Sequence, residues 1–217
     1  ILNKLGFIPV IIHGGGKRIS NKLNDAGIKS DFINGLRVTD KKSISIVEEV
    51  LNDFNNEITE ALKKNKCDSQ GITNKKNNIL IVEQENRKLG FVGVPKEINQ
   101  SIIEQIVKEK KVPVIAPLGL DKEKNVFNIN ADEAAAVIAK KINARRLIII
   151  SDVEGVLDAN KKLIPEIFEQ FSLFCAPFIF PRDLFSFFFI PLLFDFFRLN
   201  ITFFHCIFNL NINPFLF

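Results

Sequence analysis

The sequence contains no Met, and it has only three Cys among its 217 residues. Cys67, Cys175 and Cys206 lie far apart, are odd in number and lack metal-ligand spacing, which argues against a disulfide framework and a cysteine-based metal site. Such cysteines are typical of a reducing compartment, so we expect a cytoplasmic protein. The absence of Met indicates that Ile1 is not the natural start. We expect no secretory signal peptide, because the sequence opens directly on the segment before the first apolar strand.

An excess of charge of one sign is also missing. The formal net charge is +4, and Lys is interspersed with Asp and Glu. A nucleic-acid surface shows a clustered basic stripe, so we expect no nucleic-acid partner. The chain also lacks an uninterrupted run of the ~18–20 apolar residues that a membrane-spanning helix needs. This argues against a protein that crosses a membrane.

The composition changes sharply after residue 167. Most of the 22 Phe residues follow this point, whereas Lys162 is the last Lys. We therefore divide the chain into a body, residues 1–167, and a Phe-rich tail, residues 168–217. Pro residues interrupt the tail, and it has no helical or strand periodicity, so we expect it to add no strands or helices. Our hypothesis is that the tail is translated out of frame, and a membrane-associated tail is the alternative.

Apolar segments in the body alternate with amphipathic ones. Apolar residues recur every three or four positions from Ile44 to Leu62, which predicts a long helix with Asp40 as its N-cap. Asn34-Gly35 predicts a tight turn between two short strands. The remaining segments indicate strands at 8–12 and 112–117, a strand that runs into a turn at 145–157, and helices at 17–27 and 97–110. They also indicate a β-rich stretch at 67–94 with a hairpin at 77–93, and a short strand leading into an Ala-rich helix at 126–142. This order predicts an open, mainly parallel α/β sheet.

Three of the predicted strands end in unusual polar sequences. These are His13-Gly14-Gly15-Gly16, Asn128 to Asp132, and Ser151 to Gly155. Ligands of open α/β sheets bind at the carboxyl ends of the strands. The three sequences are therefore the candidate site.

Three consecutive glycines between a strand and a helix let backbone N–H groups face an anion at the N-terminus of the helix. A tight turn is the alternative, although it seldom needs three glycines. Neither a G-x-x-x-x-G-K-[ST] loop nor a G-x-G-x-x-G fingerprint is present. An esterase oxyanion hole of the HGGG type is excluded, because the chain has no G-x-S-x-G nucleophile elbow.

The other candidate residues have two interpretations each. Arg37 is either a surface charge or a bidentate clamp on a carboxylate. Asp132 is either the N-cap of the following helix or a carboxylate that orients cationic groups around a transferring phosphate. Asp152 and Gly155 either form a simple turn or border a nucleotide. Spacing alone does not decide between these interpretations.

Together these motifs resemble the amino acid kinase family. The segments "VIIHGGGKRI", "NGLRVTD", "LGFVG", "PVIAPLGLD", "NINADEAAA" and "SDVEGVLD" have the order and spacing of that family across residues 1–167. The resemblance implies an open, mainly parallel, three-layer α/β/α fold, truncated here at both ends. "NGLRVTD" together with "NINAD" is similar to the members that phosphorylate N-acetyl-L-glutamate.

The resemblance implies an activity in arginine biosynthesis. The γ-phosphoryl group of ATP, with Mg²⁺ held mainly by the nucleotide phosphates, would pass to the side-chain carboxylate of N-acetyl-L-glutamate. Family members form homo-oligomers that are at least dimers.

The resemblance also implies site roles. Gly15 and Gly16 would contact the substrate and the transferring phosphate, and Arg37 would bind the α-carboxylate. Asn128 and Asn130 would bind the N-acetyl-amino-acid portion, and Asp132 would organise catalytic lysines. The nucleotide would contact Asp152, Val153, Glu154, Gly155, Val156 and Leu157.

The sequence also departs from the family pattern. A K-x-G-G strand expected before Ile1 and a lysine-bearing segment expected after residue 167 are not in the chain, so we expect no measurable turnover from it. The segment "GITNKKNN" has Asn74 and Lys76 where Gly and Asp are common. A non-catalytic substrate-binding or membrane-associated protein is therefore the alternative function.

Overall fold

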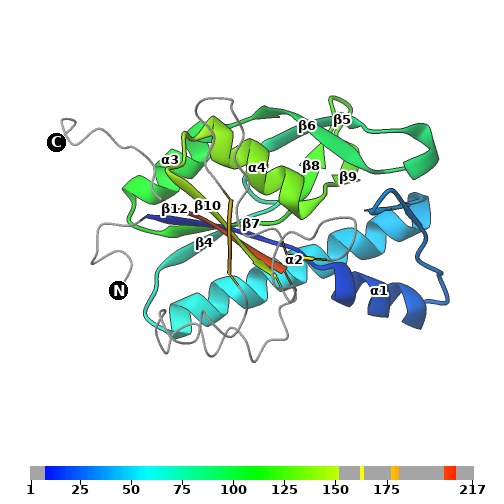
Figure 1. The fold of residues 1–217 in the computed structure, drawn as a ribbon, viewed down its shortest axis with the longest axis horizontal. Coiled ribbons are helices and arrows are strands. Elements are labelled where there is room, and N and C mark those ends of the chain that lie inside the picture. Colours follow the sequence, from blue (N-terminus) through cyan, green and yellow to red (C-terminus); the bar gives the residue numbers. More distant parts are fainter. Residues whose placement is uncertain (1–7, 152–161, 164–176, 181–202, 209–217) are drawn as a thin grey trace.

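The computed structural model describes residues 8–151, 162–163, 177–180 and 203–208. A central sheet lies between two pairs of helices, with α1 and α2 on one side and α3 and α4 on the other (Figure 1). The predicted three-layer α/β/α arrangement is confirmed.

The central sheet has six strands in the order β11-β10-β12-β1-β7-β4. Strand β1 is parallel to β7, β7 is parallel to β4, and β10 is parallel to β11, whereas β12 is antiparallel to both β1 and β10. The prediction of a mainly parallel sheet is therefore confirmed. The strands span Pro9–His13 (β1), Ser69–Ile72 (β4), Val112–Ile115 (β7), Arg146–Ser151 (β10), Pro177–Phe180 (β11) and Phe203–Phe208 (β12).

The four helices among the described residues follow the amphipathic pattern of the sequence. They span Gly16–Asp25 (α1), Lys41–Lys64 (α2), Gln100–Lys108 (α3) and Ala131–Lys141 (α4). Helix α2 begins where predicted, because the Asp40 side chain accepts hydrogen bonds from the backbone N–H groups of Lys42 and Ser43. Its buried face includes Val47, Leu51 and Ile58.

Strand β1 contributes to both sides of the central sheet. Val10 and Ile12 belong to the hydrophobic core that α3 and α4 complete. His13, one residue further on, has its side chain against Phe54 and Asn55 of α2. Successive side chains of a strand point to opposite faces, which explains this division.

A second, smaller sheet has the order β6-β5-β8-β9. Its strands are Leu80–Gln84 (β5), Gly93–Ile98 (β6), Leu118–Leu120 (β8) and Val126–Asn128 (β9). Strands β5 and β6 form the predicted hairpin, and the 3₁₀-helix η2 (Arg87–Leu89) lies between them. Strand β8 was not predicted, because three residues are too few to show a period.

The hairpin of β2 (Phe32–Ile33) and β3 (Leu36–Arg37) forms around the predicted turn. Asn34 and Gly35 both have positive φ, 50° and 80°. This is the combination that a two-residue hairpin turn of type I′ requires. The turn sets the position of Arg37 on the second strand.

The tail differs from expectation, since it supplies β11 and β12. A strand whose two faces are both buried need not alternate polar and apolar residues. The absence of periodicity in the tail therefore did not exclude strands. Phe and Ile also favour extended backbone. The backbone groups of β12 pair with β1 on one side and β10 on the other. Among the described residues, no helix has the length and apolar character needed to cross a membrane.

Candidate active site

A cleft of about 290 Å³ opens where β1 leads into α1 and β9 leads into α4. Six residues that the sequence nominated for substrate binding or catalysis line it together: Gly15, Gly16, Arg37, Asn128, Asn130 and Asp132. They come from segments far apart in the chain. The fold therefore brings the predicted substrate side of the site together.

Gly15 and Gly16 of the β1–α1 turn differ in what surrounds them. Gly15 has φ −167°, outside the left-handed region that favours glycine, but a Cβ there would lie 2.7 Å from Leu51 Cδ2. A larger residue at this position would therefore require the end of the Leu51 side chain to move. A Cβ on Gly16 would meet no atom within 4 Å. Nothing in the described protein requires Gly16, so the space beside it is available to a ligand.

The N-terminus of α1 is open to an anion. Its N-cap is Gly15, which provides no side-chain hydrogen bond, and the first turn contains no acidic residue. The first N–H groups of a helix have no partner within the helix, and the helix dipole favours negative charge beside them. With the open space at Gly16, this arrangement fits a phosphate or carboxylate oxygen.

Arg37 is not a surface charge, since only 8% of it is exposed. Its guanidinium donates to Gly16 O at 2.9 Å, to Ser20 Oγ at 2.9 Å and to Ser30 Oγ. It also lies 4.7 Å from the centroid of the Phe32 ring. Burial lowers the pKa of Arg37 from its ordinary value.

No Asp or Glu in the described part of the chain forms an ion pair with Arg37. A buried charge is normally paired, because its transfer out of water is costly. The neutral acceptors around this guanidinium leave its positive charge uncompensated beside the cleft. An anionic ligand would supply the missing partner.

The third group lies at the start of α4. Asn130 is the N-cap, and its Oδ1 accepts from Asp132 N at 2.9 Å and Glu133 N at 3.1 Å. The alternative that Asp132 caps this helix is therefore wrong. Asn128 Nδ2 approaches Thr39 Oγ1 at 3.5 Å, and Asn128 and Asp132 both line the cleft.

The predicted nucleotide segment, Asp152 to Leu157, lies outside the described residues. The preceding strand, β10, ends at Ser151. Because β12 is antiparallel to both β1 and β10, the carboxyl ends of β1 and β10 lie on the same edge of the sheet.

Sequence reasoning missed several residues around the cleft. Leu51 and Phe32 line it, and Ser20 and Ser30 hold the Arg37 guanidinium. The periodicity of α2 predicted only that Leu51 is buried. No local pattern could show that it packs on Gly15, because that contact depends on the approach of α2 to β1.

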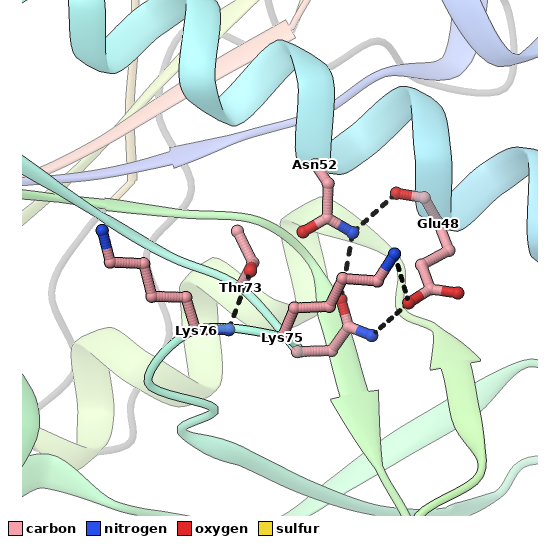
Figure 2. Close-up of polar contacts among 6 residues, drawn as sticks. Glu48, Asn52, Thr73, Lys75 and Lys76 are labelled. Atoms are coloured by element: carbon pink, nitrogen blue, oxygen red, sulfur yellow. Dashed lines mark hydrogen bonds and ion pairs between the residues drawn. The ribbon is translucent and has the colours of Figure 1, made fainter.

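The segment that departs from the family pattern lies apart from the cleft. It follows β4 and lies against α2 near Glu48 and Asn52 (Figure 2). It docks on the helix through Asn74, which is 9% exposed. Asn74 Nδ2 donates to Glu48 Oε1 at 2.8 Å, and Asn52 Nδ2 donates to Asn74 Oδ1 at 3.2 Å. Lys75 Nζ also reaches Glu48 Oε1, at 3.4 Å. The presence of Asn74 at this position is therefore explained by its hydrogen bonds to α2.

Known proteins are similar to this chain in sequence and in fold. The family model "Amino acid kinase family" matches residues 1–172. Acetylglutamate kinase of Pelagibacter ubique is 63% identical over 167 residues, covering 77% of this chain and 58% of the relative. Acetylglutamate kinase of Campylobacter fetus is 42% identical over 171 residues, covering 78% and 61%.

Among solved structures, the smu.665 protein of Streptococcus mutans has a TM-score of 0.66 and 32% identity, covering 69% of this chain and 62% of that one. The chain spans less than two thirds of the length of these relatives. The family match nevertheless extends over the whole cleft and most of the chain. The chain belongs to the amino acid kinase family.

Proposed function

We propose that the protein is an acetylglutamate kinase, which uses ATP to phosphorylate the side-chain carboxylate of N-acetyl-L-glutamate. The observation that carries the proposal is the buried Arg37 guanidinium, which has no carboxylate partner in the described chain and lines the same cleft as Gly16. Relatives that are 63% and 42% identical to this chain over its matched residues are named acetylglutamate kinase. The product would be N-acetyl-L-glutamyl 5-phosphate.

In this proposal Arg37 binds the α-carboxylate of the substrate. A guanidinium presents parallel N–H donors that match the two oxygens of a carboxylate. Asn128 and Asn130 bind the neutral N-acetyl-amino-acid portion through their side-chain amides. Since Asn130 Oδ1 already caps α4, the Nδ2 group of Asn130 is the one that would contact the substrate.

The reaction needs charge neutralisation more than proton transfer. An oxygen of the substrate's side-chain carboxylate forms a bond to the γ-phosphorus, and the bond from that phosphorus to the β,γ-bridging oxygen breaks as ADP leaves with the electron pair. A carboxylate nucleophile has no proton to lose. Backbone N–H groups at Gly15, Gly16 and the start of α1 would stabilise the oxygens of the transferring group.

The remaining roles follow the same proposal. Asp132 would orient cationic side chains around the transferring phosphate, and Asp152 to Leu157 would border the nucleotide. Mg²⁺, held mainly by the nucleotide phosphates, would neutralise part of their charge. The open space at Gly16 and the uncapped start of α1 fit a phosphate group. We further propose that residues 1–167 form the kinase unit, that the enzyme acts in arginine biosynthesis in the cytoplasm, and that it is a homo-oligomer.

Binding provides the primary test, because the chain spans only 58% of the length of its Pelagibacter ubique relative. We expect calorimetry to show saturable binding of N-acetyl-L-glutamate and its loss in R37Q. L-Glutamate, which carries a charged amino group in place of the amide, should bind more weakly. Failure of the unmodified chain to bind N-acetyl-L-glutamate at millimolar concentrations would contradict the proposal.

Trapping of the acyl phosphate with hydroxylamine tests the expectation that this chain has no measurable turnover. A hydroxamate that forms only with ATP, Mg²⁺ and N-acetyl-L-glutamate would overturn that expectation and exclude the non-catalytic alternative. Binding without hydroxamate agrees with the expectation and with both candidate functions.

A further inference from the structure

We infer that His13 is a positioning residue whose buried imidazole holds the Gly14 carbonyl and thereby directs the Gly15 N–H group into the cleft. The identity of the ligand that this N–H group would contact rests on the proposed function. The orientation of the turn rests only on the contacts of His13 and Asn55.

The imidazole of His13 is completely buried at the end of β1. Its Nδ1 lies 3.0 Å from Gly14 O, and its Nε2 lies 3.1 Å from Asn55 Nδ2. The Phe54 ring meets it edge-on, with 5.1 Å between the ring centroids. A carbonyl oxygen can only accept a hydrogen bond, so Nδ1 carries the proton and Nε2 accepts from Asn55.

Only one orientation of the Asn55 amide gives both neighbouring acceptors a donor, and it leaves Oδ1 buried without a hydrogen-bond partner among the described residues. Its Nδ2 group also donates to Val114 O of β7 at 2.9 Å. A reversed amide would place Oδ1 against two acceptors, Val114 O and His13 Nε2. In the observed orientation Oδ1 points at Gly71, where any Cβ would overlap it. The amide therefore fixes the tautomer of His13 and links the β1–α1 turn to β7.

Peptide geometry converts this anchor into an orientation of the glycine turn. In a trans peptide the C=O group and the following N–H group point in opposite directions, and the described chain has no cis peptide. Since His13 holds Gly14 O on the interior side, the N–H group of Gly15 points away from His13. Gly15 lines the cleft, and no described residue accepts a hydrogen bond from its N–H group.

The three glycines let the backbone of the turn approach a ligand closely. They also leave the turn without side chains that could fix its own conformation. Three consecutive glycines have more conformational freedom than any other tripeptide of the chain. An anchor from outside the turn is therefore needed if its N–H groups are to keep one direction. His13 and Arg37 provide it from the two ends, through Gly14 O and Gly16 O.

The charge state of His13 agrees with this role. Burial is the main cause that lowers the pKa of His13 to about 4, and the nearby Arg18 charge lowers it further. The ring is therefore neutral at physiological pH, and it offers one donor and one acceptor as the arrangement requires.

The first experiment measures the histidine tautomer in the unmodified chain without any ligand. The sequence has two histidines, so ¹⁵N spectra of the rings are simple, and H13N assigns the His13 signals. We expect the Nδ1-protonated neutral form. An Nε2-protonated ring or an imidazolium at pH 7 would overturn the inference, whatever the ligand is.

The second experiment compares H13N with H13F. The Asn side chain can still donate to Gly14 O, whereas Phe fills the space and cannot. We expect the Kd for N-acetyl-L-glutamate to rise about tenfold in H13F, the usual value of one lost hydrogen bond, and to recover at least partly in H13N. An unchanged Kd in a folded H13F would overturn the inference.

Ser69→Ala is the matched control. Ser69 is buried and donates to Thr59 O of α2 at 3.0 Å, so its loss removes a hydrogen bond between the sheet and the same helix, away from the cleft. We expect S69A to lower the Tm without changing the Kd. An equal rise of the Kd in S69A and H13F would assign His13 a merely structural role and overturn the inference.

Failure of the proposed function would be visible separately. If the unmodified chain does not bind N-acetyl-L-glutamate, inorganic phosphate is the probe, and the backbone amide signal of Gly15 is the readout. We expect phosphate to shift this signal in the unmodified chain and in H13N. A Gly15 signal that phosphate does not move would overturn the inference. If H13F does not fold, the tautomer measurement and the response of H13N decide.

Discussion

Two turns at the same edge of the central sheet are held in place in different ways. Strands β1, β7 and β4 are parallel, so the turn after β1 (Gly14–Gly16) and the turn after β4 (Thr73–Asn78) lie on one edge. The first turn has no side chains, and His13 and Arg37 hold it from outside. In the second turn Thr73 and Lys76 bond to each other (Figure 2), and the Asn74 side chain donates to Glu48 of α2.

The two turns show that lying at the ligand-binding edge of the sheet does not by itself make a turn a binding site. Both turns follow a strand at the edge where α/β sheets bind ligands. Only the first leaves open space beside a glycine and an uncapped helix N-terminus. In the second, the backbone groups of Thr73 and Lys76 and the side chain of Asn74 are used for hydrogen bonds within the protein. Unused donors beside open space therefore distinguish a candidate site from an ordinary turn.

The strongest test adds a negative charge to each turn. G16D should weaken binding of N-acetyl-L-glutamate by about a hundredfold or more, because like charges brought together cost several kcal/mol. The Tm should stay the same or rise, since a Cβ at Gly16 meets open space and a carboxylate suits the first turn of α1.

N77D is the matched control for G16D, because Asn77 lies in the second turn, is exposed and has φ 60°, which Asp tolerates. We expect its Kd to match that of the unmodified chain in calorimetry. A comparable loss of affinity in N77D would remove the distinction between the two turns.

Acid should weaken the support of the first turn. The pKa of His13 is lowered to about 4 from 6.5, so between these pH values the unfolded chain binds a proton that the folded chain does not. The free energy of unfolding should therefore fall by about 3 kcal/mol as the pH is lowered from 6.5 to 4, and this contribution should level off below pH 4.

Denaturant unfolding of the unmodified chain and H13N across this pH range isolates the contribution of His13 from that of the carboxylates. The difference between their free energies of unfolding should become smaller as the pH is lowered toward 4. Parallel curves would mean that His13 is not held neutral by burial.

A smaller effect is expected when the first turn keeps its charge but loses its geometry. R37K retains the positive charge but has neither the parallel donors nor the rigid fork that reaches Gly16, Ser20 and Ser30. We expect the Kd for N-acetyl-L-glutamate to rise about tenfold in calorimetry. An unchanged Kd would indicate that Arg37 acts only as a charge.

The smallest effect should come from the second turn. E48Q keeps the size of the side chain but weakens its bonds to Asn74 and Lys75. We expect the free energy of unfolding to fall by about 1 kcal/mol, with the Kd unchanged. In E60Q, which affects an exposed pair with Lys63, the fall should be below ~0.5 kcal/mol. A change of ligand affinity in E48Q would mean that the two turns are coupled.

The fold was largely predictable wherever a local pattern was strong. Asp40 capped α2, Asn34-Gly35 formed a turn with positive φ, and Gly27 ended the first helix region with φ 71°. Strand β8 and the tail strands were not predicted. Short or fully paired strands derive their stability from neighbours, and their own residues carry little periodicity.

The sequence by itself determined the open glycine turn, the capped long helix and the alternation that builds a parallel α/β sheet, because these depend on neighbouring residues. It also nominated Arg37, Asn128 and Asp132 through their motifs. Only the tertiary structure decided that Arg37 is buried without a carboxylate partner in the described chain, that Asn130 and not Asp132 caps α4, and that Asn55 fixes the ring of His13. The environments of Arg37 and His13 depend on contacts between residues distant in the chain, and local spacing carries no information about such contacts. The cap of α4 is a local contact, but the exact residue at which the helix begins decides it, and the sequence pattern did not fix that residue.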